Sequence, residues 1–213
     1  MTKIKMCGLS RNCDIEYANE IKPNYIGFVF AKKSKRYVSP EKAGELKALL
    51  SPEIQAVGVF VDEPEENVLE LLKNGTIDIA QLHGNEKTDY IRHIKEKSGK
   101  PVIKAVKLDE AMSAKGLLDA LLEDSRNGNE PGPDFYLIDS GAGSGKTFDW
   151  DLLKDFDLPY FLAGGLSPDN AAEAVNRLHP YCLDVSSGIE TDGVKDKDKM
   201  AAFAQAVRKE EDL

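Results

Sequence analysis

The chain contains few residues of the types that form disulfide bridges or metal sites. Its 213 residues include three cysteines, three histidines and one tryptophan. The cysteines (Cys7, Cys13 and Cys182) are odd in number and widely spaced, which argues against a disulfide framework and favours a reducing cytoplasm. The histidines are isolated, and no Cys/His cluster has the spacing of metal ligands. We therefore expect a cytoplasmic protein that binds no metal.

Long apolar runs and an excess of positive charge are also absent. No stretch approaches the roughly 18 consecutive apolar residues of a membrane span, and the N-terminal MTKIKMCG matches neither a signal peptide nor a transit peptide. The 37 acidic and 28 basic residues give a net charge of −9, which disfavours nucleic acid and anionic membranes as partners. A small anionic substrate would need local positive groups, because the field of the whole protein repels it.

The hydrophobic pattern predicts one α/β domain over residues 1–213. Hydrophobic residues make up 41% of the chain and charged residues 31%, the balance of an ordinary globular protein. Short apolar runs alternate with segments whose apolar residues recur three and four positions apart, as at Ala43, Leu46 and Leu50. The predicted strands are 3–7, 25–30, 56–61, 77–82, 102–106, 135–139, 160–163 and 182–186.

Eight such β–α units of roughly 26 residues each favour a parallel sheet closed into a (β/α)8 TIM barrel. An open, doubly wound sheet is the alternative, but it rarely contains eight consecutive units without an edge strand. The polar, Gly/Pro-rich segment 126–134 is interpreted as a surface connection and not as a domain boundary. Two helix starts are marked by a capping hydroxyl, a proline and an acid, at Ser39-Pro40-Glu41 and Ser167-Pro168-Asp169.

In such barrels the active site lies at the carboxyl ends of the strands. The apolar run 135–138 leads into Asp139 and then into a glycine-rich loop, the arrangement expected of a proton-transfer site. Cys7 ends the first strand, before Gly8. A packed core thiol is the usual alternative, but this position favours catalysis for Cys7, whereas the other two cysteines lack it. His83, at the end of the fourth strand, could either donate to a ligand or cap the strand.

The glycine-rich loop contains GAGSGKT (141–147), which looks like a phosphate-binding P-loop. The P-loop pattern GxxxxGK[ST] needs a glycine five residues before Gly145, and that position is Ser140. We therefore expect the phosphate of any ligand to be bound elsewhere.

The loops after the seventh and eighth strands form the predicted phosphate site. Their glycines let backbone N–H groups approach an anion, their serines add hydroxyls, and a helix capped by Ser167 would start nearby. Barrel enzymes often bind phosphate at this place. Tight turns alone are the alternative explanation. The predicted phosphate-site residues are Gly164, Gly165, Ser186, Ser187 and Gly188.

One dense basic cluster is present in this acidic chain. Its three lysines (Lys32, Lys33 and Lys35) are interpreted as part of a solvated loop. Arg36 is interpreted as a binding residue, because a guanidinium can bind a carboxylate in a bidentate fork that lysine cannot reproduce.

Taken together, these motifs resemble the phosphoribosylanthranilate isomerase family of tryptophan biosynthesis. The matching segments follow the order of the family over nearly the whole chain, and their combination is far more specific than any one of them. They are KMCGLSR (5–11), KRYVSPEKA (35–43), VGVFV (57–61), QLHG (81–84), the LIDS–GSGKTFDW block (137–150), LAGGLSPDN (162–170) and DVSSGIE (184–190).

The resemblance implies a (β/α)8 barrel that needs neither metal nor organic cofactor. It implies an isomerase that converts N-(5-phosphoribosyl)anthranilate to 1-(2-carboxyphenylamino)-1-deoxyribulose 5-phosphate by an Amadori rearrangement, the third step from chorismate to tryptophan. The implied partner is therefore a small molecule that carries both a phosphate and a carboxylate.

The resemblance also implies roles for individual residues. Asp139 corresponds to the acid that protonates the ribose ring oxygen, and Cys7 to the base that removes the C2 proton. Arg36 corresponds to the group that binds the anthranilate carboxylate, and the segments around Gly165 and Ser187 correspond to the phosphate site. Asp184, like His83, is expected to face the substrate.

Free aspartate titrates near ~3.9 and free cysteine near ~8.5, so the resting protonation states of such a pair are the reverse of those required. The site must shift these pKa values or exchange a proton between the two groups.

Two departures from the family pattern are small. Lys35 stands where a proline often precedes the arginine, and the loop GAGSGKTF (141–148) replaces a GGTGKTF-like sequence. A flexible lid over the ligand is still expected there.

Three other functions remain possible from the sequence: an isomerase with a broader range of aminoaldose phosphates, a P-loop nucleotide-binding protein, and a non-catalytic barrel. Turnover of a histidine-pathway aminoimidazole carboxamide ribotide would support the first, and Mg-dependent ATP binding through Lys146 the second. No long exposed apolar helix face is evident, so we expect a monomer and not a homodimer.

Overall fold

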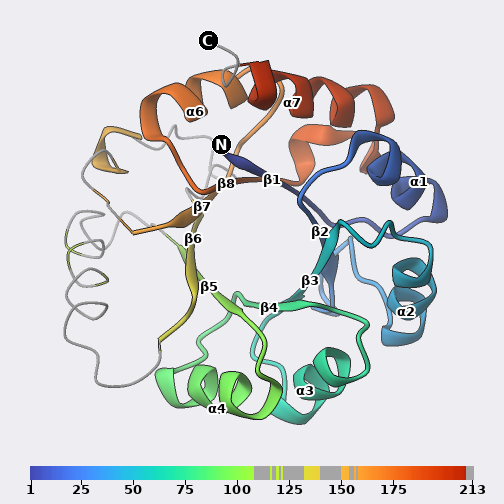
Figure 1. Ribbon diagram of the computed structural model, residues 1–213, viewed down its shortest axis with the longest axis vertical. Coiled ribbons are helices and arrows are strands. Elements are labelled where there is room, and N and C mark those ends of the chain that lie inside the picture. The colour runs from blue at the N-terminus through green and yellow to red at the C-terminus, as the bar shows by residue number, and fades with distance from the viewer. Residues whose placement is uncertain are drawn as a thin grey trace.

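Eight parallel strands close into a barrel in the computed structural model (Figure 1). The structure describes residues 1–107, 116, 119, 121, 132–139, 150–153, 156 and 158–209. Each strand pairs with the next along the chain, and β8 pairs with β1, so the barrel has no open edge. The strands are β1 (Lys3–Cys7), β2 (Tyr25–Val29), β3 (Gln55–Phe60), β4 (Ile79–Leu82), β5 (Val102–Lys107), β6 (Phe135–Asp139), β7 (Tyr160–Ala163) and β8 (Cys182–Val185).

The predicted (β/α)8 barrel is therefore confirmed, and the open doubly wound sheet is wrong because the first and last strands are hydrogen-bonded to each other. All eight strands were located to within two residues at each end. The largest difference is at β4, which begins two residues after the predicted start at Ile77.

Helices surround the barrel on the outside (Figure 1). They are α1 (Asn12–Ile21), α2 (Pro40–Ala48), α3 (Glu65–Lys73), α4 (Thr88–Ser98), α6 (Ala171–Leu178) and α7 (Lys197–Lys209). Two 3-10 turns, η2 (Trp150–Leu153) and η3 (Ser187–Ile189), and a two-stranded hairpin of β9 (Glu190–Thr191) and β10 (Val194–Lys195) complete the described elements. Of the predicted surface connection 126–134, only residues 132–134 lie in the described part of the chain.

The two predicted helix starts had different outcomes. Ser39 caps α2 as expected, since its hydroxyl accepts a hydrogen bond from the N–H of Lys42 and Pro40 is the first helical residue. The start predicted at Pro168 is wrong, because α6 begins at Ala171.

A local side-chain clamp explains why α6 starts late. The Asn170 side chain accepts a hydrogen bond from the N–H of Ser167 at 2.8 Å and donates one to the carbonyl of Gly165 at 3.0 Å. The Ser167 hydroxyl accepts from the N–H of Asp169. These bonds stabilise a turn over 167–170 in place of the first helical turn. The loop after β7 is therefore fixed by a turn and not by a helix N-terminus.

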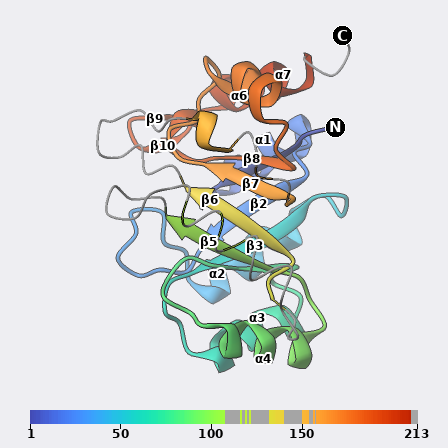
Figure 2. The same cartoon turned by 90° about the vertical axis from the view of Figure 1, so that its left-hand side faces the viewer.

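The barrel interior is apolar at the amino-terminal end of the strands. Side chains from several strands fill it, and among them are Val57, Ile103, Leu137 and Phe161. The Phe161 ring lies 5.6 Å between centroids from the ring of Phe135, and equally far from two tyrosine rings. Side chains fill this end, and the predicted site residues lie at the other, carboxyl end of the strands, where the hairpin β9–β10 also lies (Figure 2).

No helix within the described ranges combines the length and the apolar character needed to cross a bilayer.

We expect Phe161→Ala to lower the free energy of unfolding by about 3–5 kcal/mol, because the ring is fully buried and its loss leaves a cavity among aromatic neighbours. The measurement is urea denaturation followed by circular dichroism. Leu49→Ala is the control, since Leu49 is 51% exposed and its truncation should cost less than about 0.5 kcal/mol. Equal losses in the two variants would contradict the assignment of the aromatic layer as core.

Candidate active site

The strand register brings the predicted site residues to one end of the barrel. Asp139 of β6 is paired with Ala163 of β7, Ala163 with Asp184 of β8, and Asp184 with Lys5 of β1. Residues in such a row point to the same face of the sheet. Cys7 follows Lys5 by two positions and therefore shares its face. Residues separated by more than 130 positions in the sequence thus become neighbours in the mouth of the barrel.

Lys5 and Asp184 form a buried ion pair below the mouth. The Nζ atom of Lys5 lies 2.8 Å from Oδ2 of Asp184, and the lysine side chain is fully inaccessible. Burial by itself would lower the pKa of Lys5, but the Asp184 carboxylate, with further contributions from Cys7 and Cys182, raises it. Burial likewise raises the pKa of Asp184, and Lys5 opposes that rise.

The second oxygen of Asp184, Oδ1, accepts no hydrogen bond from any residue that the structure describes. A buried polar atom without a partner is costly, so such an atom in a native site is suited to a ligand that donates to it. The sequence had given Asp184 no defined role, and it had missed Lys5. The signal for Lys5 was a second lysine inside the strand KIKMC, two positions before Cys7 and flanked by the apolar Ile4 and Met6.

His83 faces the predicted acid Asp139. Its Nε2 lies 3.5 Å from Oδ2 of Asp139, and its Nδ1 lies 3.2 Å from the side-chain nitrogen of Gln81. If that nitrogen donates to Nδ1, then Nε2 carries the ring proton and can donate it toward Asp139. The backbone N–H of His83 also bonds to the carbonyl of Phe60, so His83 both extends β4 and points its ring into the site.

Cys7 lies buried at the end of β1, beside Gly27 of β2. A Cβ atom at position 27 would lie 2.6 Å from the Cys7 sulfur, so glycine there leaves room for the thiol. Burial raises the pKa of Cys7, while the positive charges of Lys5 and Lys195 oppose that rise. The resting group is therefore a protonated thiol at neutral pH.

The loops after β7 and β8 pack directly against each other. Gly164 and Gly165 have φ values of 94° and 64°, a left-handed backbone that favours glycine. A Cβ at Gly188 would lie only 1.9 Å from the carbonyl oxygen of Leu166, so the two loops touch through backbone at that point. The structure thus brings together the two loops of the predicted phosphate site.

The Ser186 hydroxyl already makes a hydrogen bond within the protein. Its Oγ donates a hydrogen bond to the carbonyl of Cys7 at 3.1 Å. Ser187 and Gly188 begin the 3-10 turn η3. The backbone amides of this turn and of the loop after β7, together with the Ser187 hydroxyl, are the groups with which this place can bind an anion.

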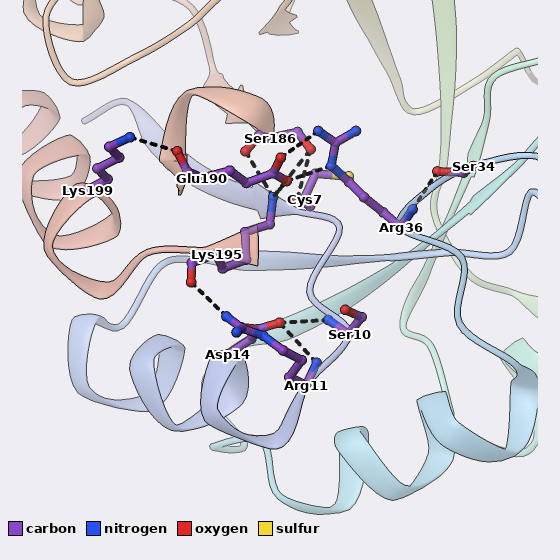
Figure 3. Close-up of polar contacts among 10 residues, drawn as sticks. All are labelled: Cys7, Ser10, Arg11, Asp14, Ser34, Arg36, Ser186, Glu190, Lys195 and Lys199. Atoms are coloured by element: carbon purple, nitrogen blue, oxygen red, sulfur yellow. Dashed lines mark hydrogen bonds and ion pairs between the residues drawn. The ribbon is translucent and has the colours of Figure 1, made fainter. Parts of the chain in front are cut away.

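Arg36 makes a bidentate ion pair within the protein (Figure 3). Its Nε donates to Oε1 of Glu190 at 2.6 Å, and its Nη2 donates to Oε2 at 2.8 Å. The hydrogen bonds to Glu190 raise the pKa of Arg36. Neither Glu190 nor its second partner, Lys195, was recognised from the sequence, although Glu190 closes the segment DVSSGIE.

The glycine-rich loop 140–149, with the predicted lid and Lys146, lies outside the described residues. In the described part of the chain, no group of three His, Cys, Asp or Glu side chains is placed to hold a metal ion. A separate surface hollow is lined by residues that include Met1, His179 and Tyr181. None of the predicted site residues lines it, so the geometry places the candidate site at the strands' carboxyl ends and not at this hollow.

Comparisons with known proteins agree with this geometry. A family model described as N-(5'phosphoribosyl)anthranilate (PRA) isomerase matches residues 4–206. The chain is 47% identical over 209 residues to the N-(5'-phosphoribosyl)anthranilate isomerase of Endomicrobium trichonymphae, covering 98% of this chain and 99% of the relative. It is 45% identical to the enzyme of the same name from Thermoanaerobacter sp. (strain X514), covering 98% of each chain.

Solved structures show the same likeness. The phosphoribosyl anthranilate isomerase of Thermotoga maritima superposes with a TM-score of 0.83 at 35% identity, covering 98% of this chain and all of that one. A phosphoribosyl anthranilate isomerase in complex with reduced 1-(o-carboxyphenylamino)-1-deoxyribulose 5-phosphate superposes with a TM-score of 0.82 at 33% identity over the same coverage. The chain belongs to the N-(5'-phosphoribosyl)anthranilate isomerase family.

Proposed function

We propose that this protein converts N-(5-phosphoribosyl)anthranilate to 1-(2-carboxyphenylamino)-1-deoxyribulose 5-phosphate in tryptophan biosynthesis. The observation that carries the proposal is the family match over residues 4–206, with Cys7 and Asp139 both at the carboxyl end of the barrel strands. A relative 33% identical to this chain binds the reduced form of that product, which supports the substrate class.

The reaction needs one acid and one base in turn. Asp139 donates a proton to the ribose ring oxygen as the bond between C1 and that oxygen breaks and the anilinic nitrogen forms an iminium. The Cys7 thiolate then removes the proton from C2, and the electron pair moves to give an enolamine. Return of a proton to C1 and loss of the proton from the C2 hydroxyl yield the ketose. Each positioned proton transfer of this kind contributes ~10²–10⁴ in rate.

The acid and the base share one proton in this proposal. Burial raises the pKa of Cys7, so the resting site holds a thiol, which the proposal pairs with an ionised Asp139. The active form, with a thiolate and a carboxylic acid, contains the same number of protons as this resting form. It is therefore a minor tautomer of the pair, and its fraction does not depend on pH between the two apparent pKa values.

The two anionic ends of the substrate are assigned to two different groups of residues in the mouth. The anthranilate carboxylate binds Arg36, and the phosphate binds the amides and hydroxyls of the two packed loops, which carry Gly164, Gly165, Ser187 and Gly188. Local donors thus overcome the repulsion expected from a net charge of −9. The unpartnered Oδ1 of Asp184 is placed to accept a hydrogen bond from a substrate hydroxyl.

His83 is assigned as a positioning residue of the acid in this proposal. Its imidazole ring lies between Gln81 and Asp139, and a proton on Nε2 would stabilise the ionised form of Asp139 after the ribose ring opens.

The expected monomer stays a prediction, because one Thermotoga maritima relative is described as dimeric. Sedimentation at micromolar concentration would test it.

We expect Cys7→Ser and Asp139→Asn each to lower kcat by at least ~10²-fold with a much smaller change in KM, because each removes a proton-transfer group and little binding surface. Loss of phosphoribosylanthranilate is followed by its fluorescence in excess chelator, which also tests the expected independence from metal. Cys13→Ser, a cysteine outside the mouth of the barrel, is the matched control and should keep full activity. Full activity in Cys7→Ser or Asp139→Asn would remove the role assigned to that residue.

The shared proton also predicts the pH dependence. Between about pH 7 and the pKa of the Cys7 thiol, which burial raises, kcat/KM should be flat, because the fraction of the active tautomer is constant there. Above the pKa of the thiol, kcat/KM should fall, because the pair has then lost the proton that the acid must donate. A tenfold rise per pH unit from pH 7 to the thiol pKa would instead show that the thiolate acts without a shared proton. The pH–rate profile of the unmodified protein distinguishes the two.

A further inference from the structure

The Arg36 side chain is fixed along its whole length. Its guanidinium is bound by both oxygens of Glu190, at 2.6 and 2.8 Å. Its stem packs against Gly8, where an added Cβ would lie 2.4 Å from Cδ of Arg36. A long side chain that would otherwise lose rotamer entropy when it binds a ligand is therefore already ordered.

The contact with Glu190 leaves one edge of the guanidinium for a ligand. A guanidinium has five N–H groups, and Glu190 uses the Nε–H and one Nη2–H. The two N–H groups of Nη1 and the second one of Nη2 remain. The outward Nη1–H and Nη2–H are parallel and can bind a second carboxylate in the same bidentate geometry. Arg36 can thus hold Glu190 and a ligand at once.

A buried lysine keeps this cluster positive. Lys195 donates to Oε1 of Glu190 at 2.6 Å, and its side chain is only 1% exposed. Arg36 and Lys195 contribute two positive charges and Glu190 one negative charge, so the cluster has a net charge of +1. With Glu190 alone, the charge of Arg36 would be neutralised. With Lys195 present, the cluster can hold Arg36 in place and still attract an anion.

The same lysine links Arg36 to the loop after β8. Its Nζ donates to the carbonyl of Ser186 at 2.9 Å, and the Ser186 hydroxyl donates to the carbonyl of Cys7 at 3.1 Å. Figure 3 shows the continuous path from Arg36 through Glu190 and Lys195 to Ser186 and Cys7. The loop that carries Ser187 and Gly188 is therefore connected to the carboxylate-binding side of the mouth by direct polar contacts.

We propose that Glu190 and Lys195 are positioning residues for substrate recognition: they hold the Arg36 guanidinium so that its outer edge binds the carboxylate of the substrate. The proposal rests on the role given to Arg36 above. The opposite account makes Glu190 a competitor that occupies Arg36 until the substrate displaces it. The two accounts predict effects of opposite sign, because removing a competitor tightens binding of a carboxylate and removing a positioning group weakens it.

The experiment measures binding of two ligands by calorimetry to the full-length protein. One is reduced 1-(o-carboxyphenylamino)-1-deoxyribulose 5-phosphate, and the other is the same compound without the carboxylate. The ratio of their Kd values is the carboxylate preference, and it cancels effects on the shared phosphate and sugar. The variants are Glu190→Gln, Arg36→Ala, the double variant, and Asp192→Asn. Asp192 is an exposed residue of the same hairpin, so its substitution makes the same change in net charge without contacting Arg36.

We expect Glu190→Gln to reduce the carboxylate preference by about tenfold, because a neutral amide cannot accept both N–H groups of the fork. Binding of the ligand without the carboxylate should change by less than about twofold, and Asp192→Asn should match the unmodified protein. Glu190→Gln should cause no further loss of preference in the Arg36→Ala background. If Glu190→Gln does not fold, Glu190→Asp should show the same loss to a smaller degree.

Two results would overturn the inference while leaving the role of Arg36 intact. One is an unchanged carboxylate preference in Glu190→Gln, and the other is a tighter binding of the carboxylated ligand, which would identify Glu190 as a competitor. A full carboxylate preference in Arg36→Ala would instead refute the assignment of Arg36 itself. A thermal melt of each variant separates a loss of recognition from a loss of folding.

Discussion

The pairing of β8 with β1 is the contact on which the rest of this site depends. It brings Asp184 next to Lys5 and allows the buried ion pair below the barrel mouth. Two charges at this depth are tolerated because each satisfies the other, and loss of either one would leave the other unpaired. The pair also places a positive charge near Cys7, and Oδ1 of Asp184 stays buried without a hydrogen-bond partner among the described residues. The strand pairing that closes the barrel is thus also the one that buries this ion pair beside Cys7.

Polar groups above this ion pair are organised by the same requirement. Glu190 would be costly to bury alone, and so would Lys195, but together with Arg36 they satisfy one another. His83, Gln81 and Asp139 form a second chain of contacts from β4 and β6. In both cases the protein arranges polar side chains before the substrate arrives, which is the preorganisation that proton transfer and anion binding require.

The sequence was sufficient to predict the features that depend on neighbouring residues, such as strand positions and a helix cap. The alternation of apolar runs and helical periods gave the strand positions to within two residues, and the capping of α2 by Ser39 followed from three adjacent residues. The same rule failed at Ser167, because Asn170 clamps the backbone of the preceding turn and delays α6 to Ala171. A side-chain clamp to the carbonyl of Gly165 competes with the helix, and the capping rule alone does not weigh that competition.

The sequence by itself determined the barrel, its eight strands and the candidate residues at the strand ends, because periodicity and strand order depend on neighbouring residues. Only the tertiary structure decided which of these residues have charged partners. Lys5 binds a residue 179 positions away and Arg36 one 154 positions away. Such pairs depend on barrel closure and register, which place side chains in contact regardless of their distance along the chain. The family match names the chemistry, and the tertiary contacts show that Glu190 and Lys195 are the partners that order Arg36.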